Sequence, residues 1–319
     1  FKLRKLLESI YNDNNSEEIE LIFFQLLKVL DEFQLNYGYE ETHNTISWNQ
    51  SHSVLITYAD SVKKKGEPTL VTLRGLLSNY FKDISSVVHI LPFLKSTSDG
   101  GFAVSSHKHL DEKFGDWSDL NRLSKNHILM ADLVLNHVSS SHPWVQQFIK
   151  SQEPGLSNIY APSQKLDWSN VIRPRSSSLF SQINTLDGEK LVWTTFGPDQ
   201  VDLNWKNPKV ILEFLNLIVS YVKNGIKWFR LDAVGFIWKE PGTTCLHLPE
   251  AHLIIKTLRI QLLNLLSDGN LIKDAIEYKL HFTAADIKEK RKRLFLNIGH
   301  TFGHSIESVQ NLDTEEYYR

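Results

Sequence analysis

Four short apolar runs, separated from one another by helical or polar stretches, constrain the fold of this 319-residue chain most strongly. They occupy residues 54–58, 87–91, 128–135 and 226–234. Strands that alternate with helices form parallel sheets, because each crossover needs room for a helix. The sequence therefore predicts an α/β fold with a parallel sheet.

The segments around these runs predict three further parts. Apolar residues recur at spacings of three and four in residues 1–37, as in an N-terminal helical hairpin. Residues 139–207 are too long for a simple loop and predict a subdomain inserted after the third strand. Residues 267–319 have helical, charged patterns without a comparably strong fifth strand. We therefore assign residues 50–266 to the α/β unit and residues 267–319 to a helical tail.

Charge and composition exclude several classes of partner. The 35 basic and 37 acidic residues nearly balance, so no overall field favours nucleic acid or an anionic membrane. No apolar run approaches the roughly 18 residues of a membrane span, and the N-terminal residues lack a signal-peptide pattern. One cysteine, Cys245, cannot form an internal disulfide. We expect a cytoplasmic protein with a small-molecule ligand; its oligomeric state stays open.

Polar side chains that could take part in binding or catalysis lie at the ends of all four runs. They are Tyr58 and Asp60, then Ser98, Asp99 and Phe102, then Asp132, Asn136 and His137, and finally Arg230 and Asp232. Any one of them alone fits a turn or a cap. Their recurrence at successive strand ends favours a functional site, because the loops after parallel strands form one face of a barrel.

The Arg230-Leu-Asp232 sequence is informative because side chains alternate along a strand. Arg230 and Asp232 are thus expected on the same face, where the guanidinium can keep the carboxylate ionised and oriented. An ionised carboxylate is what nucleophilic attack on an anomeric carbon requires. A structural salt bridge inside a barrel is the alternative interpretation.

Ten motifs, in a fixed order over about two thirds of the chain, carry a family resemblance. They are Leu55-Ile-Thr-Tyr-Ala-Asp60, His89-Ile-Leu-Pro-Phe93, Ser98-Asp-Gly-Gly-Phe-Ala-Val104, Phe114-Gly-Asp-Trp117, Asp132-Leu-Val-Leu-Asn-His-Val138, Val192-Trp-Thr-Thr-Phe196, Asp199-Gln-Val-Asp-Leu-Asn204, Arg230-Leu-Asp-Ala-Val-Gly235, Trp238-Lys-Glu240 and His247-Leu-Pro-Glu250. The set resembles the sucrose phosphorylase and glucosylglycerate phosphorylase group of the α-amylase clan.

The resemblance implies a partial (β/α)8 TIM-type barrel, comprising the first four strands, in a retaining α-glucoside phosphorylase. Such an enzyme transfers glucose from an α-glucoside to inorganic phosphate and needs no metal or organic cofactor. By matching motifs, Asp232 would be the nucleophile and Arg230 its orienting partner.

The resemblance also implies the residues that bind substrate. Asp99, Phe102 and His137 would line the glucose subsite. Arg173 and Arg175, in the inserted subdomain, resemble a loop that faces the acceptor, and two guanidiniums suit phosphate. This loop leans toward relatives that use glucosylglycerate or a phosphorylated sucrose. An exposed Arg-Pro-Arg turn without function is the alternative.

The acid/base carboxylate of this family is missing from the sequence. Retaining transfer needs a second carboxylate about 5–5.5 Å from the nucleophile, which the family places on the fifth strand. No matching motif follows Leu266, and Glu240 and Glu250 match other family positions. We therefore expect impaired phosphorolysis.

The tail carries a resemblance of its own. Gly299-His-Thr-Phe-Gly-His304 and its flanks resemble the metal-binding helical region of 3-dehydroquinate synthase, in which the first histidine binds zinc. A helix would place His300 and His304 on one face. Two histidines rarely make a zinc site, so we expect no tightly bound metal.

Three hypotheses follow from these resemblances. The chain is an α-glucoside phosphorylase domain, a non-catalytic remnant or composite chain joined near Ser267, or a metal-dependent cyclase of the dehydroquinate synthase type. The motifs around Asp232 favour the first, the missing acid/base the second, and only the tail the third.

Overall fold

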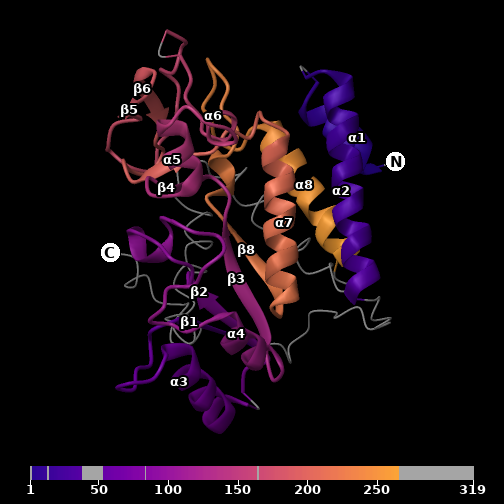
Figure 1. The fold of residues 1–319 in the computed structure, drawn as a ribbon, viewed down its shortest axis with the longest axis vertical. Coiled ribbons are helices and arrows are strands. Elements are labelled where there is room, and N and C mark those ends of the chain that lie inside the picture. The colour runs from indigo at the N-terminus through magenta and orange to yellow at the C-terminus, as the bar shows by residue number, and fades with distance from the viewer. Residues whose placement is uncertain (1, 13, 38–52, 83, 164, 266–319) are drawn as a thin grey trace, which may run out of the picture.

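The computed structural model describes residues 2–12, 14–37, 53–82, 84–163 and 165–265. A four-stranded parallel sheet forms its centre (Figure 1), in the order β1-β2-β3-β8. The strands are β1 (Val54–Tyr58), β2 (Val87–Leu91), β3 (Ile128–Val134) and β8 (Ile226–Asp232). The predicted α/β fold with four parallel strands is confirmed; β3 ends one residue, and β8 two residues, before the apolar runs do.

A helix follows each strand, as in a (β/α) barrel. These helices are α3 (Thr69–Leu76), which continues into the π-helical turn Leu77–Phe81, α4 (Trp117–Ser124), α7 (Lys209–Lys223) and α8 (Pro249–Leu265). Asp116 starts α4 with a capping box: its side chain accepts from the backbone N–H groups of Ser118 and Asp119. The N-terminal hairpin, α1 (Lys2–Ile10) and α2 (Ser16–Tyr37), packs on α7 and α8 (Figure 1).

Burial explains why the helices remain on the sheet. The apolar stripe of α7 buries Val210, Ile211, Phe214, Leu215 and Ile218. Strand β2 is buried along most of its length, as expected for a parallel strand covered on both faces. In the described part of the chain, no helix is long and apolar enough to cross a membrane.

The segment after β3 folds as a cluster of small elements at the top of Figure 1. Strand β4 (His137–Ser139) pairs antiparallel with β7 (Gln200–Asp202), and β5 (Phe180–Thr185) with β6 (Gly188–Trp193). Two short helices, α5 (Pro143–Ile149) and α6 (Gly155–Asn158), complete it. The small sheet thus places His137 opposite Asp202. The predicted tail, with His300 and His304, lies outside the described residues.

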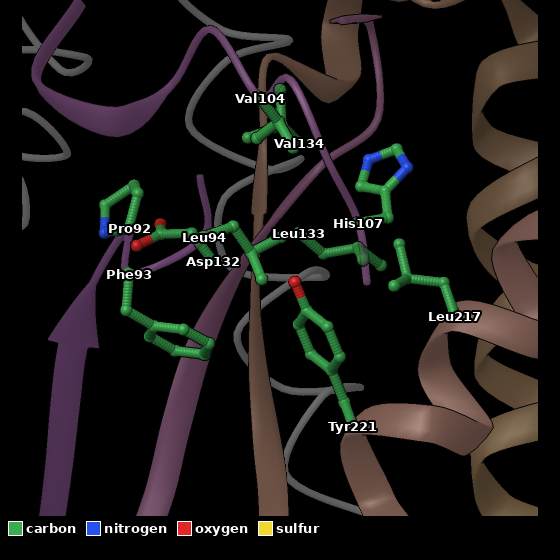
Figure 2. A pocket seen from close by; sticks show the side chains of 10 residues that line it. All are labelled: Pro92, Phe93, Leu94, Val104, His107, Asp132, Leu133, Val134, Leu217 and Tyr221. Atoms are coloured by element: carbon green, nitrogen blue, oxygen red, sulfur yellow. The ribbon is translucent and has the colours of Figure 1, made fainter. Parts of the chain in front are cut away.

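A small pocket lies between the sheet and α7 (Figure 2). Its walls are mostly apolar, with His107 and Tyr221 among the polar residues. The His107 ring also contacts the His142 ring, with 4.9 Å between their centroids. Burial lowers the pKa of His107 to about 4, and burial together with His107 lowers the pKa of His142 to about 2. Both rings are therefore neutral in the folded protein at neutral pH.

The free energy of unfolding is expected to fall as the pH is lowered from about 6.5 to about 4. Unfolded histidines bind protons in this window and the buried rings do not, so each ring lowers the stability by up to about 1.4 kcal/mol per pH unit. Urea unfolding across this window should show a shallower pH slope in His107→Gln than in the exposed control His109→Gln. Equal slopes in the two variants would contradict this account.

Candidate active site

Arg230 joins two aspartates at the carboxyl end of the sheet. Its Nη2 lies 2.9 Å from Asp232 Oδ1, and its Nη1 donates to Asp132 Oδ1. The strand register explains the geometry, since Arg230 is directly opposite Asp132. Burial opposes the charge of Arg230, but the two carboxylates outweigh it and raise the pKa of the guanidinium. A fixed cation therefore faces Asp232, on the side that strand alternation predicts.

Asp132 in turn is held by a contact on its other oxygen. Its second oxygen, Oδ2, lies 3.1 Å from His89 Nε2, and both side chains are buried. His89, Asp132 and Arg230 thus form a row across β2, β3 and β8. Asp132, which was expected at the end of its strand, lies inside β3. Its pairing with Arg230 depends on the register of β3 and β8, which the sequence does not show.

Asp99, His137 and Gln200 form a second group. Gln200 Nε2 lies 2.9 Å from Asp99 Oδ2 and 3.1 Å from His137 Nε2. Burial lowers the pKa of His137, although the charges of Asp202, Asp232 and Asp99 act in the opposite direction. A neutral imidazole between nearby carboxylates can exchange hydrogen bonds with sugar hydroxyls. Gln200 lies within one of the ten motifs, but the sequence predicted no role for it.

Phe102, Arg173 and Arg175 make different contacts with the residues described above. The Phe102 ring lies under the Arg230 guanidinium, with 5.7 Å from Cζ to the ring centroid. Arg175 Nη2 lies 4.0 Å from Asp99 Oδ1. Arg173 instead donates to the carbonyl and hydroxyl of Ser177 in its own loop, and burial lowers its pKa. Only the second arginine of this loop contacts an expected glucose-binding residue.

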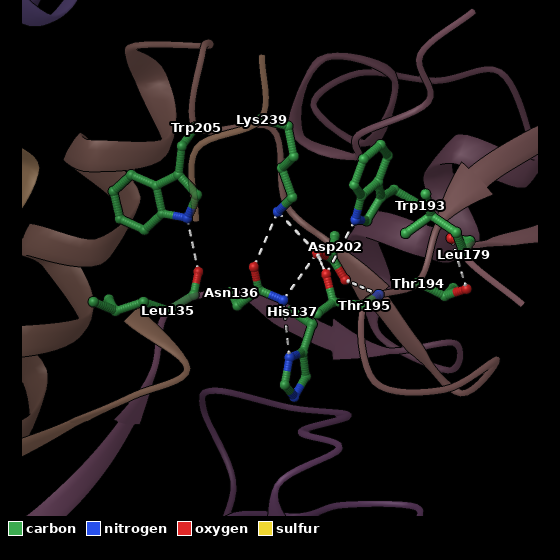
Figure 3. Close-up of polar contacts among 10 residues, drawn as sticks. All are labelled: Leu135, Asn136, His137, Leu179, Trp193, Thr194, Thr195, Asp202, Trp205 and Lys239. Carbon is green, nitrogen blue, oxygen red and sulfur yellow. Dashed lines mark hydrogen bonds and ion pairs between the residues drawn. The ribbon is translucent and has the colours of Figure 1, made fainter. Parts of the chain in front are cut away.

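A buried polar network lies behind His137 (Figure 3). Lys239 Nζ is 2.8 Å from Asp202 Oδ2 and 3.0 Å from Asn136 Oδ1. Asp202 also accepts from the backbone N–H and hydroxyl of Thr195, at 3.0 and 2.6 Å. Lys239 and Asp202 are almost completely buried, so each charge depends on the other. The network ties β4, β7 and the loop after β8 together, and it was not identified from the sequence.

The remaining carboxylates considered from the sequence lie in other arrangements. Glu240 forms an ion pair with Lys206 at 2.5 Å, and Glu250 lies in the first turn of α8. Asp60, after β1, pairs with Lys63 at 3.1 Å, and Tyr58 is exposed. Among the described residues, no fifth strand pairs with the free edge of β8. The described residues therefore do not include the fifth strand, on which the family is expected to carry the acid/base.

Comparison with known proteins gives two family matches. The description "Alpha amylase, catalytic domain" matches residues 56–264, and "3-dehydroquinate synthase C-terminal" matches residues 245–315. Both resemblances found in the motifs are thereby confirmed. The matches overlap over residues 245–264, most of which form α8, and α8 packs on α7, α1 and α2.

Curated relatives match the first region. A glucosylglycerate phosphorylase from Allomeiothermus silvanus is 44% identical over 225 residues, which are 70% of this chain and 40% of that protein. One from Spirochaeta thermophila is 36% identical over 81% of this chain and 44% of its own length. The chain thus spans less than half the length of these relatives.

A solved structure supports the same assignment. The sucrose 6F-phosphate phosphorylase from Thermoanaerobacter thermosaccharolyticum superposes with a TM-score of 0.63 at 30% identity, covering 71% of this chain and 48% of the other. The four-stranded sheet accordingly corresponds to part of an α-amylase-type barrel. Through residues 56–264, the chain belongs to the α-amylase family.

Proposed function

We propose that this chain contains the glucose-binding and nucleophile half of a retaining α-glucoside phosphorylase. The contact that carries the proposal is the ion pair between Arg230 and Asp232, at 2.9 Å, at the carboxyl end of a parallel barrel sheet. The identity to glucosylglycerate phosphorylases supports the substrate class, with glucosylglycerate or sucrose as donor and inorganic phosphate as acceptor.

The chemistry follows a double displacement. Asp232 attacks the anomeric carbon of the glucoside, and the bond from that carbon to the leaving oxygen breaks as an acid protonates the oxygen. Phosphate then attacks the same carbon and releases glucose 1-phosphate and the free carboxylate. Arg230 orients the Asp232 carboxylate through their ion pair.

The other site residues have binding roles in this proposal. Asp99 and His137 hydrogen-bond to glucose hydroxyls, and Phe102 supports Arg230 from one side. Arg175 attracts the anionic acceptor beside Asp99, and Arg173 orders the loop that carries both arginines. A non-catalytic remnant would keep these contacts, so the nucleophile requires a direct test.

We expect α-glucosyl fluoride to attach one glucosyl group to Asp232 when phosphate is omitted. Fluoride leaves without a proton, so this step needs the nucleophile and not the acid, and the ester accumulates because water attack needs a general base. Peptide mass mapping of the full chain should find the added glucosyl group on the peptide with Asp232. Asp232→Asn should lose the label and the exposed control Asp187→Asn should keep it.

The absence of label on the wild-type chain would favour the non-catalytic remnant. Labelling at another carboxylate would assign the nucleophile elsewhere. Either result contradicts the proposed role of Asp232.

A further inference from the structure

The Asp199 carboxylate accepts hydrogen bonds from two separate segments near the site, residues 97–98 and residues 139–140. Its Oδ2 accepts from Thr97 Oγ1 at 2.6 Å and from Ser98 Oγ at 2.5 Å. Its Oδ1 accepts from Ser140 Oγ at 2.5 Å, and from Ser139 Oγ and the Ser140 backbone N–H at 3.3 Å each. A carboxylate has about four lone-pair positions, so these donors occupy it fully.

This arrangement keeps Asp199 ionised and away from substrate chemistry. Burial acts to raise the pKa of Asp199, but the hydrogen bonds from Ser140, Ser98 and Thr97 outweigh it and hold the pKa below its ordinary range. A carboxylate whose acceptor positions are in use is a poor ligand for a sugar hydroxyl and a poor proton carrier. Its effect on the site must pass through its neighbours.

The neighbours concerned are Asp99 and Gln200, which contact each other in the proposed glucose subsite. Ser98, one donor, directly precedes Asp99, and Gln200 directly follows Asp199. Gln200 Nε2 links Asp99 Oδ2 to His137 Nε2. One anchor thus fixes the backbone on both sides of the contact between Asp99 and Gln200.

Asp99 needs such an anchor because of its backbone conformation. Its φ is 55°, in the left-handed region that residues other than glycine rarely adopt. A residue persists there only when the surroundings determine its conformation. The turn at Asp99 is held by backbone bonds from Phe102 N to Asp99 O and from Ala103 N to Ser98 O, at 3.1 and 3.3 Å, and by the bond from Ser98 Oγ to Asp199.

We propose that Asp199 is a positioning residue, which holds Asp99 and Gln200 in the geometry that the glucose subsite requires. The proposal rests on the proposed function for its catalytic consequence, but the positioning itself has an independent readout. Asp199 acts across the junction of the barrel and the inserted subdomain, because Ser98 belongs to the loop after β2 and Gln200 to β7.

The catalytic test uses labelling by α-glucosyl fluoride. Asp199→Asn retains the size of the side chain but replaces one acceptor oxygen with a donor. We expect labelling to slow about ten- to a hundred-fold, since a displacement of about 1 Å in a positioning group has effects of this size, while Asp187→Asn labels normally. In an Asp99→Asn background, Asp199→Asn should slow labelling much less, because both changes remove the same positioned group.

An NMR measurement separates the positioning from the activity. The ring nitrogen signals of His137, identified by their loss in His137→Gln, should shift in Asp199→Asn and not in Asp187→Asn, because Gln200 contacts that ring. If the wild type is never labelled, the proposed function fails and the His137 signals still decide the positioning. Unchanged His137 signals, or fully additive effects of the Asp199 and Asp99 changes on labelling, would overturn the proposal.

Discussion

Phosphorolysis of sucrose and glucosylglycerate by this chain is expected to be near background, and at least about 10²- to 10⁴-fold slower than reaction with α-glucosyl fluoride. A positioned general acid contributes about this factor, because a sugar alkoxide leaves poorly without a proton. The described residues place Glu240 in an ion pair with Lys206 and Glu250 at the start of α8. These positions give neither glutamate a role beside Asp232, so we assign neither as the acid.

The unpaired edges of the sheet are expected to lower the activity further. Within the described residues, β1 and β8 are its outer strands, and each has an edge without a neighbour. Such edges favour association or local opening and would loosen the support of Arg230 and Asp232. The loss is therefore expected to exceed the factor of about 10² to 10⁴ that a general acid contributes.

The measurement is phosphate-dependent release of glucose 1-phosphate by the full chain. With sucrose or glucosylglycerate, Asp232→Asn should change the rate little, whereas it should abolish reaction with the fluoride. Robust turnover of either natural donor that disappears in Asp232→Asn would overturn this expectation. It would mean that Glu240, Glu250 or a carboxylate outside the described residues serves as the acid.

Replacing Lys239 with Met is expected to lower the free energy of unfolding by about 3–5 kcal/mol. The ammonium is the partner of Asp202 at 2.8 Å, and the side chains are 2% and 0% exposed. Without it, Asp202 must keep an uncompensated buried charge or take up a proton. Either change would weaken the hydrogen bonds that Asp202 accepts from Asn136 and Thr195.

Urea unfolding followed by tryptophan fluorescence can measure this loss. Lys206→Met is a matched control, because Lys206 pairs with Glu240 at the surface, where an ion pair is worth about 0–1 kcal/mol. The double variant Lys239→Met/Asp202→Asn should recover part of the stability, since it removes both charges. A loss below about 1 kcal/mol in Lys239→Met would contradict the account of a paired buried charge.

Local patterns in the sequence predicted the framework of the site. Apolar runs of strand length located β1, β2, β3 and β8, because parallel strands whose two faces are covered are rich in apolar residues. Alternation along β8 placed Arg230 and Asp232 on one face. Strand location and side-chain alternation both depend on residues that are close in the sequence, so a local sequence pattern can predict them.

The tertiary structure decided which distant residues meet. Gln200 reaches His137 from 63 positions away, Arg230 reaches Asp132 from 98, and Lys239 reaches Asn136 from 103. Folding of the inserted subdomain onto the sheet brings Gln200 and Asp202 to the strand ends and separates the roles of Arg173 and Arg175. Polar residues at such separations leave no periodic signal, because their pairing depends on the path of the intervening chain and on the hydrogen bonds that burial then requires.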